Sequence, residues 1–291
     1  MQQVVINILV SFSLYLTIAV SYSIIYYITK IFHLAHAAII TLGAYFLFYF
    51  NLTLGFSFII AAFIAILLSA IIGMACDFLI YRQMRKRDAA PLVFLIASLG
   101  LYIVLQNVIS LVFGDDNKIL NTSVVAIGRE FLGAYITDTQ IAILIISTGI
   151  FILVSLFLKF TPLGRAIRAV SSNPELSNIY GIPANKIILI VFGISSAIAA
   201  IVGILSAMET NMNPTFGFNL LLYGIVTMII GGVGSNWGLV GGALLLATAQ
   251  HLAAYYIGSQ WMDAVAYIIL ILFLIAKPLG FSGKRLKKIE I

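Results

Sequence analysis

Charged residues are scarce in this chain of 291 residues. Only 9% are Asp, Glu, Lys or Arg, whereas 62% are hydrophobic and the mean hydropathy is +1.13. Because a soluble domain carries about 25% charged residues, this composition excludes an ordinary soluble protein. Apolar runs of about 20 residues, enough to cross a bilayer core of roughly 30 Å, recur along the whole length. We therefore expect an all-α protein, a polytopic transmembrane helical bundle, with a single integral membrane domain over residues 1–291.

Residues for metal binding and catalysis are also few. The single cysteine, Cys76, excludes an intramolecular disulfide and a metal site built on several cysteines. His33 and His36 could be metal ligands or proton carriers, but only His251 accompanies them, so we prefer polar groups at the inner end of a broken helix. The chain has no H-E-x-x-H and no G-x-S-x-G pattern. We expect no catalytic residue, no metal site, no cofactor and no enzyme activity.

Nine apolar segments are candidates for membrane spans. They are Val4–Ile28, Ala35–Phe50, Leu54–Tyr81, Pro91–Phe113, Thr139–Leu158, Ile187–Met208, Phe218–Ile230, Leu239–Ile257 and Trp261–Ala276. The second and the seventh are short for a full crossing. Short, glycine-interrupted segments are typical of broken or re-entrant helices that line a path, because irregular backbone at membrane depth must face protein or water. We therefore expect eight or nine spans, some of them short or broken.

The basic residues predict an orientation, since Lys and Arg of short loops stay in the cytoplasm. They form three clusters, within residues 82–87, 159–186 and 284–288, and alternating crossings place all three on one face. With Lys30 and Lys277, that face holds 14 of the 16 Lys and Arg residues, leaving Lys118 and Arg129 opposite. We expect the N-terminus outside and a basic tail, residues 277–291, in the cytoplasm. The placement of these cations in short loops explains the net charge of +6, so we expect no nucleic-acid partner. We expect the lipid bilayer as a partner instead.

One polar segment, Lys159–Lys186, separates two apolar spans. Asn173 is a favourable N-cap, Pro174 suits the first helical position, Glu175 complements the positive helix end, and Gly181 is a stop signal. This pattern predicts a helix of about two turns, preceded by an amphipathic stretch with an apolar stripe of Leu163, Ile167 and Val170. Such short helices are marginal alone. The segment is therefore either a linker resting on lipid headgroups or a helix docked in a groove of a cytoplasmic partner.

Four motifs, in the same order, resemble the permeases of bacterial ABC importers of the branched-chain amino acid type. They are FHLAH (32–36) with LGAY (42–45), TPLGRAIRAV (161–170) with NPE (173–175) and GI (181–182), GGVGS (231–235) with GGA (241–243), and KPLGF (277–281). The resemblance covers about residues 6–284. His33 stands where the family usually has Asn, and Ala37 where it has Gly, which leaves the exact substrate open.

The resemblance implies a permease in the bacterial inner membrane that takes a small polar solute from an external substrate-binding protein. It also implies cytoplasmic ATPase subunits and a second permease subunit, homologous or identical. Residues 159–186 would then be the loop that couples the permease to the ATPase, through Gly164, Arg165, Arg168, Asn173, Glu175 and Gly181. The translocation path would include His33, His36, Gly231, Gly232 and Gly234.

Several alternatives stay open from the sequence. Branched-chain amino acids are the leading solutes, followed by urea or short amides and then sugars. A stand-alone secondary transporter or channel is the rival class, although no charge is clearly placed at the centre of a span, where it would mark an ion route. The glycines at 231–242 lack the Lys-Ser/Thr of a phosphate-binding loop, and they instead predict a tight turn at Ser235-Asn236 and close helix packing.

Overall fold

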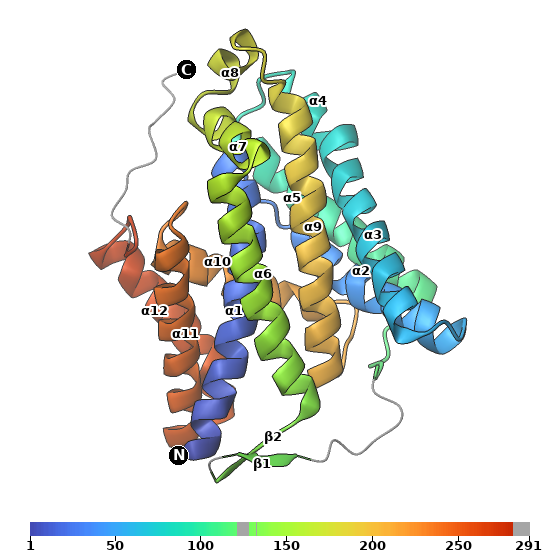
Figure 1. Cartoon of the computed structure of the whole chain (residues 1–291), viewed down its shortest axis with the longest axis vertical. Helices are drawn as coiled ribbons and strands as arrows, with labels where there is room; N and C mark the ends of the chain where they lie inside the picture. Colours follow the sequence, from blue (N-terminus) through green and yellow to red (C-terminus); the bar gives the residue numbers. More distant parts are fainter. Residues whose placement is uncertain (121–127, 132, 282–291) are drawn as a thin grey trace.

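The computed structural model describes residues 1–120, 128–131 and 133–281 as a bundle of long helices (Figure 1). In this part of the chain, eight helices are long and apolar enough to cross a membrane, and α10 (Phe216–Gly231) is a shorter apolar helix. The predicted polytopic helical bundle is confirmed. The sequence allowed eight or nine spans, and the two numbers differ only in whether the short helix α10 is counted.

The elements follow one another with few irregular connections. They are α1 (Gln2–Thr29), α2 (His36–Phe48), η1 (Tyr49–Thr53), α3 (Phe58–Cys76), η2 (Asp77–Tyr81), α4 (Arg82–Arg85), α5 (Pro91–Phe113), β1 (Arg129–Phe131), β2 (Ala134–Ile136), α6 (Asp138–Phe160), α7 (Pro162–Ser172), α8 (Pro174–Ile179), α9 (Ala184–Glu209), α10 (Phe216–Gly231), α11 (Asn236–Tyr256), η3 (Ser259–Trp261) and α12 (Met262–Ala276). The two strands form an antiparallel hairpin.

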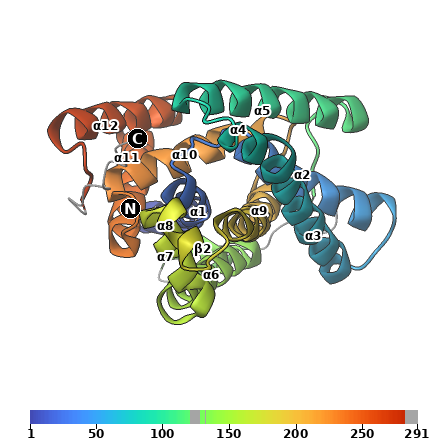
Figure 2. The same ribbon diagram turned by 90° about the horizontal axis from the view of Figure 1, so that it is seen from above.

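Helices α1 and α9 form the centre of the bundle. α1 packs against α6, α9, α10 and α11, and α9 packs against α1, α2 and α3; Figure 2 shows α1 enclosed by these neighbours, with α5 and α12 along one edge. In its most apolar window α9 is 72% buried, whereas α12 is only 6% buried. A helix that is apolar all round can be buried or can face lipid. α9 is of the first kind and α12 of the second.

Two predicted spans have different boundaries in the structure. The span expected over residues 35–50 extends to Thr53 through the π-helical turn η1. The span expected from Leu54 begins at Phe58, because Gly55 has a φ of +74° and turns the chain back, with the Asn51 side chain donating to the carbonyl of Phe56. That span then continues through η2 and α4 to Arg85, and its buried Asp77 pairs with Arg85 at 2.8 Å.

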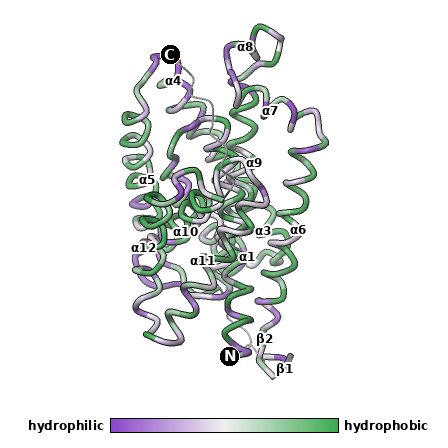
Figure 3. Tube along the Cα trace, turned by 90° about the vertical axis from the view of Figure 1, so that its left-hand side faces the viewer, coloured by the Kyte–Doolittle hydropathy of each residue, from purple (hydrophilic) through white to green (hydrophobic). Residues whose placement is uncertain are grey.

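The bundle has two polar ends separated by an apolar belt (Figure 3). The N-terminus and the β1–β2 hairpin lie at one end, which we call the hairpin end (Figure 1). α4, α7 and α8 lie at the opposite end, which we call the α7–α8 end. The basic clusters at 82–87 and 159–186 thus share one end, as the sequence predicts. The third cluster, Lys284, Arg285, Lys287 and Lys288, lies outside the described residues, as does residue 282 onward of the predicted tail.

Candidate functional site

The polar segment 159–186 contains two short helices with the predicted start and stop signals. The Asn173 side chain accepts a hydrogen bond from the Leu176 amide at 2.9 Å, and Pro174 is the first residue of α8. Gly181, with a φ of +78°, follows the end of that helix. Glu175 lies in the first turn, where a carboxylate favours the positive helix end. The predicted two-turn helix is confirmed.

Helix α7 is fixed against the end of α6 by close backbone contact. Its apolar stripe is buried at Ile167 and Val170. A Cβ atom on Gly164 would lie 2.4 Å from the carbonyl oxygen of Leu158 and 2.6 Å from that of Phe157, so only glycine fits there. The guanidinium of Arg168 donates to the same Leu158 carbonyl. Arg165 and Arg168 are both exposed.

Helix α8 exposes the apolar residues that the sequence placed on one face. Leu176 is 48% exposed, Ile179 79% and Tyr180 78%. Exposed apolar side chains that are grouped together mark a surface that contacts a protein or a membrane. α8 therefore presents an apolar knob, Leu176, Ile179 and Tyr180, and the preceding helix α7 carries the exposed cation of Arg165. The assignment of this segment to ATPase coupling stays a prediction.

The glycines at 231–242 join α10 to α11 with almost no space between their backbones. A Cβ atom on Gly238 would lie 2.0 Å from the Gly231 carbonyl oxygen, and one on Gly242 would lie 2.5 Å from that of Thr227. Gly232 and Gly234 have φ values of +87° and +81°, which form the turn. Ser235 then caps α11, accepting from the Gly238 amide at 3.1 Å, so the turn lies just before the predicted Ser235-Asn236 position.

The KPLGF motif packs against this glycine turn. The amide of Phe281 donates to the carbonyl of Ile230 at 2.8 Å, and a Cβ atom on Gly280 would lie 2.6 Å from the Gly232 nitrogen. Two motifs about 45 residues apart in the sequence are therefore one structural unit. Close glycine contacts of this kind let backbones approach each other within a membrane.

His33 and His36 are fully buried in the interior of the bundle. The Nδ1 atom of His33 lies 2.8 Å from the hydroxyl of Tyr81, and the Nε2 atom of His36 lies 2.8 Å from that of Ser21. The ring of His33 also stands edge-on against Phe192, 5.1 Å away between centroids. Both histidines hold the start of α2 in the bundle, and neither is among the residues that line the cavity described next. Their place in the translocation path stays a prediction.

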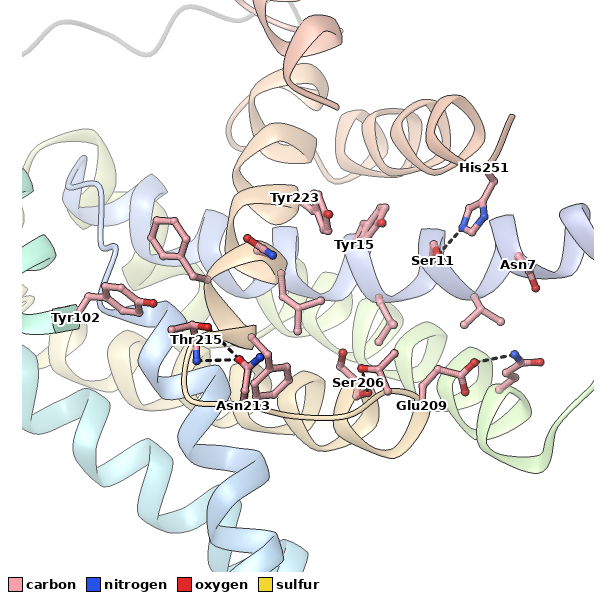
Figure 4. Close-up of a pocket in the computed structure, with 18 residues that line it drawn as sticks. Asn7, Ser11, Tyr15, Tyr102, Ser206, Glu209, Asn213, Thr215, Tyr223 and His251 are labelled. Atoms are coloured by element: carbon pink, nitrogen blue, oxygen red, sulfur yellow. Dashed lines mark hydrogen bonds between the residues drawn. The ribbon is translucent and has the colours of Figure 1, made fainter. Parts of the chain in front are cut away.

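A cavity of about 860 Å³ opens in the half of the bundle toward the hairpin end (Figure 4). Its walls come from α1, α5, α6, α9, α10, α11 and the connection between α9 and α10. The polar lining residues are Asn7, Ser11, Tyr15, Tyr102, Gln140, Ser206, Glu209, Thr210, Asn213, Thr215, Asn219, Tyr223 and His251. The apolar ones are Val10, Leu14, Phe216, Phe218 and Leu220.

Hydrogen bonds fix several side chains of the cavity wall. Ser11 Oγ lies 2.7 Å from His251 Nε2, and the Gln140 amide donates to Glu209 at 2.8 Å (Figure 4). The rings of Tyr15 and Tyr223 lie 5.0 Å apart, and the Tyr223 hydroxyl donates to Asp263. An amide-rich and hydroxyl-rich hollow of this size can solvate a small polar solute in a bundle that is otherwise apolar.

The sequence analysis missed this cavity, although part of it has a visible signal. Asn7, Ser11 and Tyr15 are spaced four residues apart on the first span, so they share one helix face. A polar stripe on an apolar span marks a surface that faces water or other polar groups. The cluster Asn213, Thr215 and Asn219 is a second such signal.

A smaller cavity, about 340 Å³, lies between α7, α6, α1 and the start of α11. It brings Arg168 of the predicted coupling set and Gly234 of the predicted path to the same hollow. Asn236, beside Gly234, donates to Ser155 of α6 at 2.9 Å. The α7 segment and the glycine turn, predicted independently, are thus linked through α6.

Comparisons with known proteins agree with the motifs. The family described as branched-chain amino acid transport system, permease component, matches residues 4–274. The high-affinity branched-chain amino acid permease protein LivH of Escherichia coli is 29% identical over 285 residues, which covers 94% of this chain and 92% of LivH. BraD of Pseudomonas aeruginosa, of the same description, is 30% identical with the same coverage. The ribose import permease protein RbsC of Haemophilus influenzae matches only 50% of this chain, at 30% identity.

A solved structure, PsaBC from Streptococcus pneumoniae in complex with Fab, shares the fold. The TM-score is 0.53 at 12% sequence identity, and the match covers 94% of this chain and 92% of that chain. At this identity the likeness concerns the fold alone. The family match, in contrast, spans nearly every helix of the bundle, from α1 into α12. The chain belongs to the family of permease components of branched-chain amino acid transport systems.

Proposed function

We propose that this chain is the transmembrane permease subunit of an ATP-binding-cassette importer that moves branched-chain amino acids or a similar small polar solute. The observation that carries the proposal is the pairing of a polar cavity toward the hairpin end with the exposed α8 knob at the other end. The cavity can hold a solute, and the α8 knob can bind an ATPase subunit.

The hairpin end faces the outside of the cell in this proposal. The basic residues of the two described clusters gather at the α7–α8 end, as expected for the cytoplasmic side. An external substrate-binding protein delivers the solute to the mouth of the cavity. The protein then lies in the plasma membrane of a bacterium, with its N-terminus outside the cell.

Cytoplasmic ATPase subunits dock on α7 and α8. The apolar knob enters a groove of the ATPase, and Arg165 pairs with an acidic group at the rim. Arg168 is engaged with the end of α6, so it transmits movement of α7 to that helix. ATPases of this type act as a pair, and therefore a second permease subunit, homologous or identical, completes the complex.

The solute is an amino acid with a branched aliphatic side chain. LivH and BraD carry that substrate class in their names and match almost the whole chain, whereas the sugar permease RbsC matches half of it. The cavity supports this choice, because its wall offers amides and hydroxyls next to Leu14, Leu220 and aromatic rings. Urea, short amides and sugars remain the alternative solutes.

Uptake into proteoliposomes tests the proposal. The chain is reconstituted with its ATPase subunits, second permease and binding protein. The uptake of labelled leucine is then followed with ATP, without ATP, and with a proton or sodium gradient instead. We expect uptake only with ATP and the complete set. Uptake by the purified chain alone, driven by an ion gradient, would assign the protein to the secondary transporters.

A further inference from the structure

The cavity toward the hairpin end has a single acidic side chain among the described residues that line it. This residue is Glu209, the last residue of α9, and it is exposed at the mouth. The same lining residues include no Lys and no Arg. Every other polar group of the wall is an amide, a hydroxyl or an imidazole. The formal charge of the wall therefore depends on Glu209.

The Glu209 carboxylate is held in place by a neutral partner. Its Oε1 atom accepts a hydrogen bond from the Gln140 amide at 2.8 Å, and Figure 4 shows Glu209 on the wall opposite His251. The two ion pairs found in the described part of the chain are Asp77–Arg85 and Arg129–Asp138, so neither neutralises Glu209. A hydrogen bond from an amide orients a carboxylate without removing its charge.

A second carboxylate adds to the negative potential from behind the wall. Asp263 accepts a hydrogen bond from the hydroxyl of Tyr223, which lines the cavity. An acidic, partly enclosed hollow concentrates positively charged groups and repels anions. A free carboxylate on a solute must therefore be met by a neutral donor, such as the side-chain amide of Asn213.

We propose that Glu209 is a specificity-determining residue, which binds the ammonium group of the solute at the mouth of the cavity, with Gln140 as the residue that positions its carboxylate. The aliphatic side chain of the solute then lies toward Tyr15 and Tyr223, whose rings pack together. This inference rests on the proposed function. It goes beyond it by assigning the recognition of the amino group to one side chain of the permease rather than to the binding protein alone.

A cysteine reporter in the cavity tests this assignment without the binding protein. The one native cysteine, Cys76, is buried, so it gives little background. Asn219 is exposed and lines the cavity, and N219C in the complete complex, reconstituted with its ATPases, can be labelled by a water-soluble thiol reagent. Three probes compete with labelling: leucine, isoamylamine, which lacks the carboxylate, and isocaproate, which lacks the ammonium group.

We expect leucine and isoamylamine to slow the labelling of N219C, and isocaproate to leave it unchanged. Adding E209Q raises the leucine concentration for half-protection roughly threefold to tenfold, because one partner of an ammonium–carboxylate contact is lost. E209D, which keeps the charge on a shorter arm, gives an intermediate value. D116N removes an exposed carboxylate that is not a lining residue and leaves protection unchanged.

The contrary outcomes are clear. Equal protection by leucine and isocaproate, or a half-protection concentration that E209Q does not change, overturns the assignment of Glu209. Absence of any protection by leucine also overturns it. A thiol at Ser57, which is exposed outside the cavity, should be insensitive to all three probes. The proposed function is judged separately by ATP-driven leucine uptake, so the two can fail independently.

Discussion

The two ends of this protein are built in opposite ways. The α7–α8 end presents an apolar knob and an exposed cation on two short helices that are fixed by caps and by a glycine contact with α6. The half toward the hairpin end contains the polar cavity. Its neutral polar groups and its one carboxylate come from helices that are far apart in the sequence. An exposed apolar surface suits a protein partner, whereas a polar cavity suits a small solute. This difference supports the proposal that the ATPase acts at one end and that the solute binds toward the other.

The largest expected effect is at the glycine that seats α7. G164V places side-chain atoms against the carbonyl oxygens of Leu158 and Phe157, which are backbone atoms and cannot move aside cheaply. ATP-driven uptake should fall at least about tenfold, with the protein still in the membrane, because backbone displacement at such a site disturbs everything attached to it. The measurement is uptake per reconstituted complex.

Gly149 in α6 provides the matched control, because a Cβ atom there meets nothing within 4 Å. G149V should retain uptake close to that of the unaltered protein. Equal losses in G164V and G149V would show that the seat of α7 has no special part in coupling.

The second-largest effect on uptake is expected from reversing charges at the α7–α8 end. Reversing Arg165 and Arg168 together to Glu should reduce ATP-driven uptake roughly tenfold, because attraction to an acidic ATPase rim becomes repulsion and the Arg168 bond to α6 is lost. Membrane insertion and leucine protection of N219C should not change. K86E with R87E, two exposed cations at the same end, is the control. Normal uptake by the Arg165 and Arg168 variant removes these cations from the mechanism.

A smaller effect is expected in the cavity. Y223A removes a ring that packs against Tyr15 and a hydroxyl that binds Asp263. The leucine concentration for half-protection of N219C should rise several-fold, on the order expected for an aromatic contact, while the coupling of ATP hydrolysis to an externally supplied binding protein persists. Y255A, on an exposed tyrosine near the end of α11, should have no effect. A Y223A variant that binds leucine normally, but whose ATP hydrolysis no longer depends on the binding protein, would assign Tyr223 to coupling rather than to solute binding.

The smallest effect concerns the cap of α8. N173A should destabilise this helix by about 1 kcal/mol, the usual cost of losing an N-cap. Hydrogen exchange of the Leu176 amide, the donor to Asn173, should become about fivefold faster. Uptake should fall by no more than about twofold, because the ATPase still holds the knob. S172A, next to the cap and exposed, should leave exchange unchanged.

The α7–α8 end was predictable because its signals are local. Asn173, Pro174 and Gly181 determine the limits of a six-residue helix within a single short segment. The membrane helices were predictable for the same reason, since length and hydropathy are properties of one stretch of chain. The close approach of α10 and α11 followed from the glycines that the sequence displays.

The cavity was not predictable because tertiary packing assembles it. Glu209 meets Gln140, 69 residues away, and Ser11 meets His251, 240 residues away, so no window of sequence contains either pair. His33 and His36 illustrate the converse. The sequence displays both histidines, but their partners Tyr81 and Ser21 become visible only in the structure, and their place in the translocation path stays a prediction.

The central claim is that the hairpin end faces the outside of the cell and the α7–α8 end faces the cytoplasm. Thiol labelling of intact cells tests this claim directly. A membrane-impermeant reagent should label N219C in the cavity of intact cells, and should label K86C, at an exposed position of the α7–α8 end, only after the cells are opened. Labelling of K86C in intact cells, with N219C protected until the membrane is broken, would contradict the account.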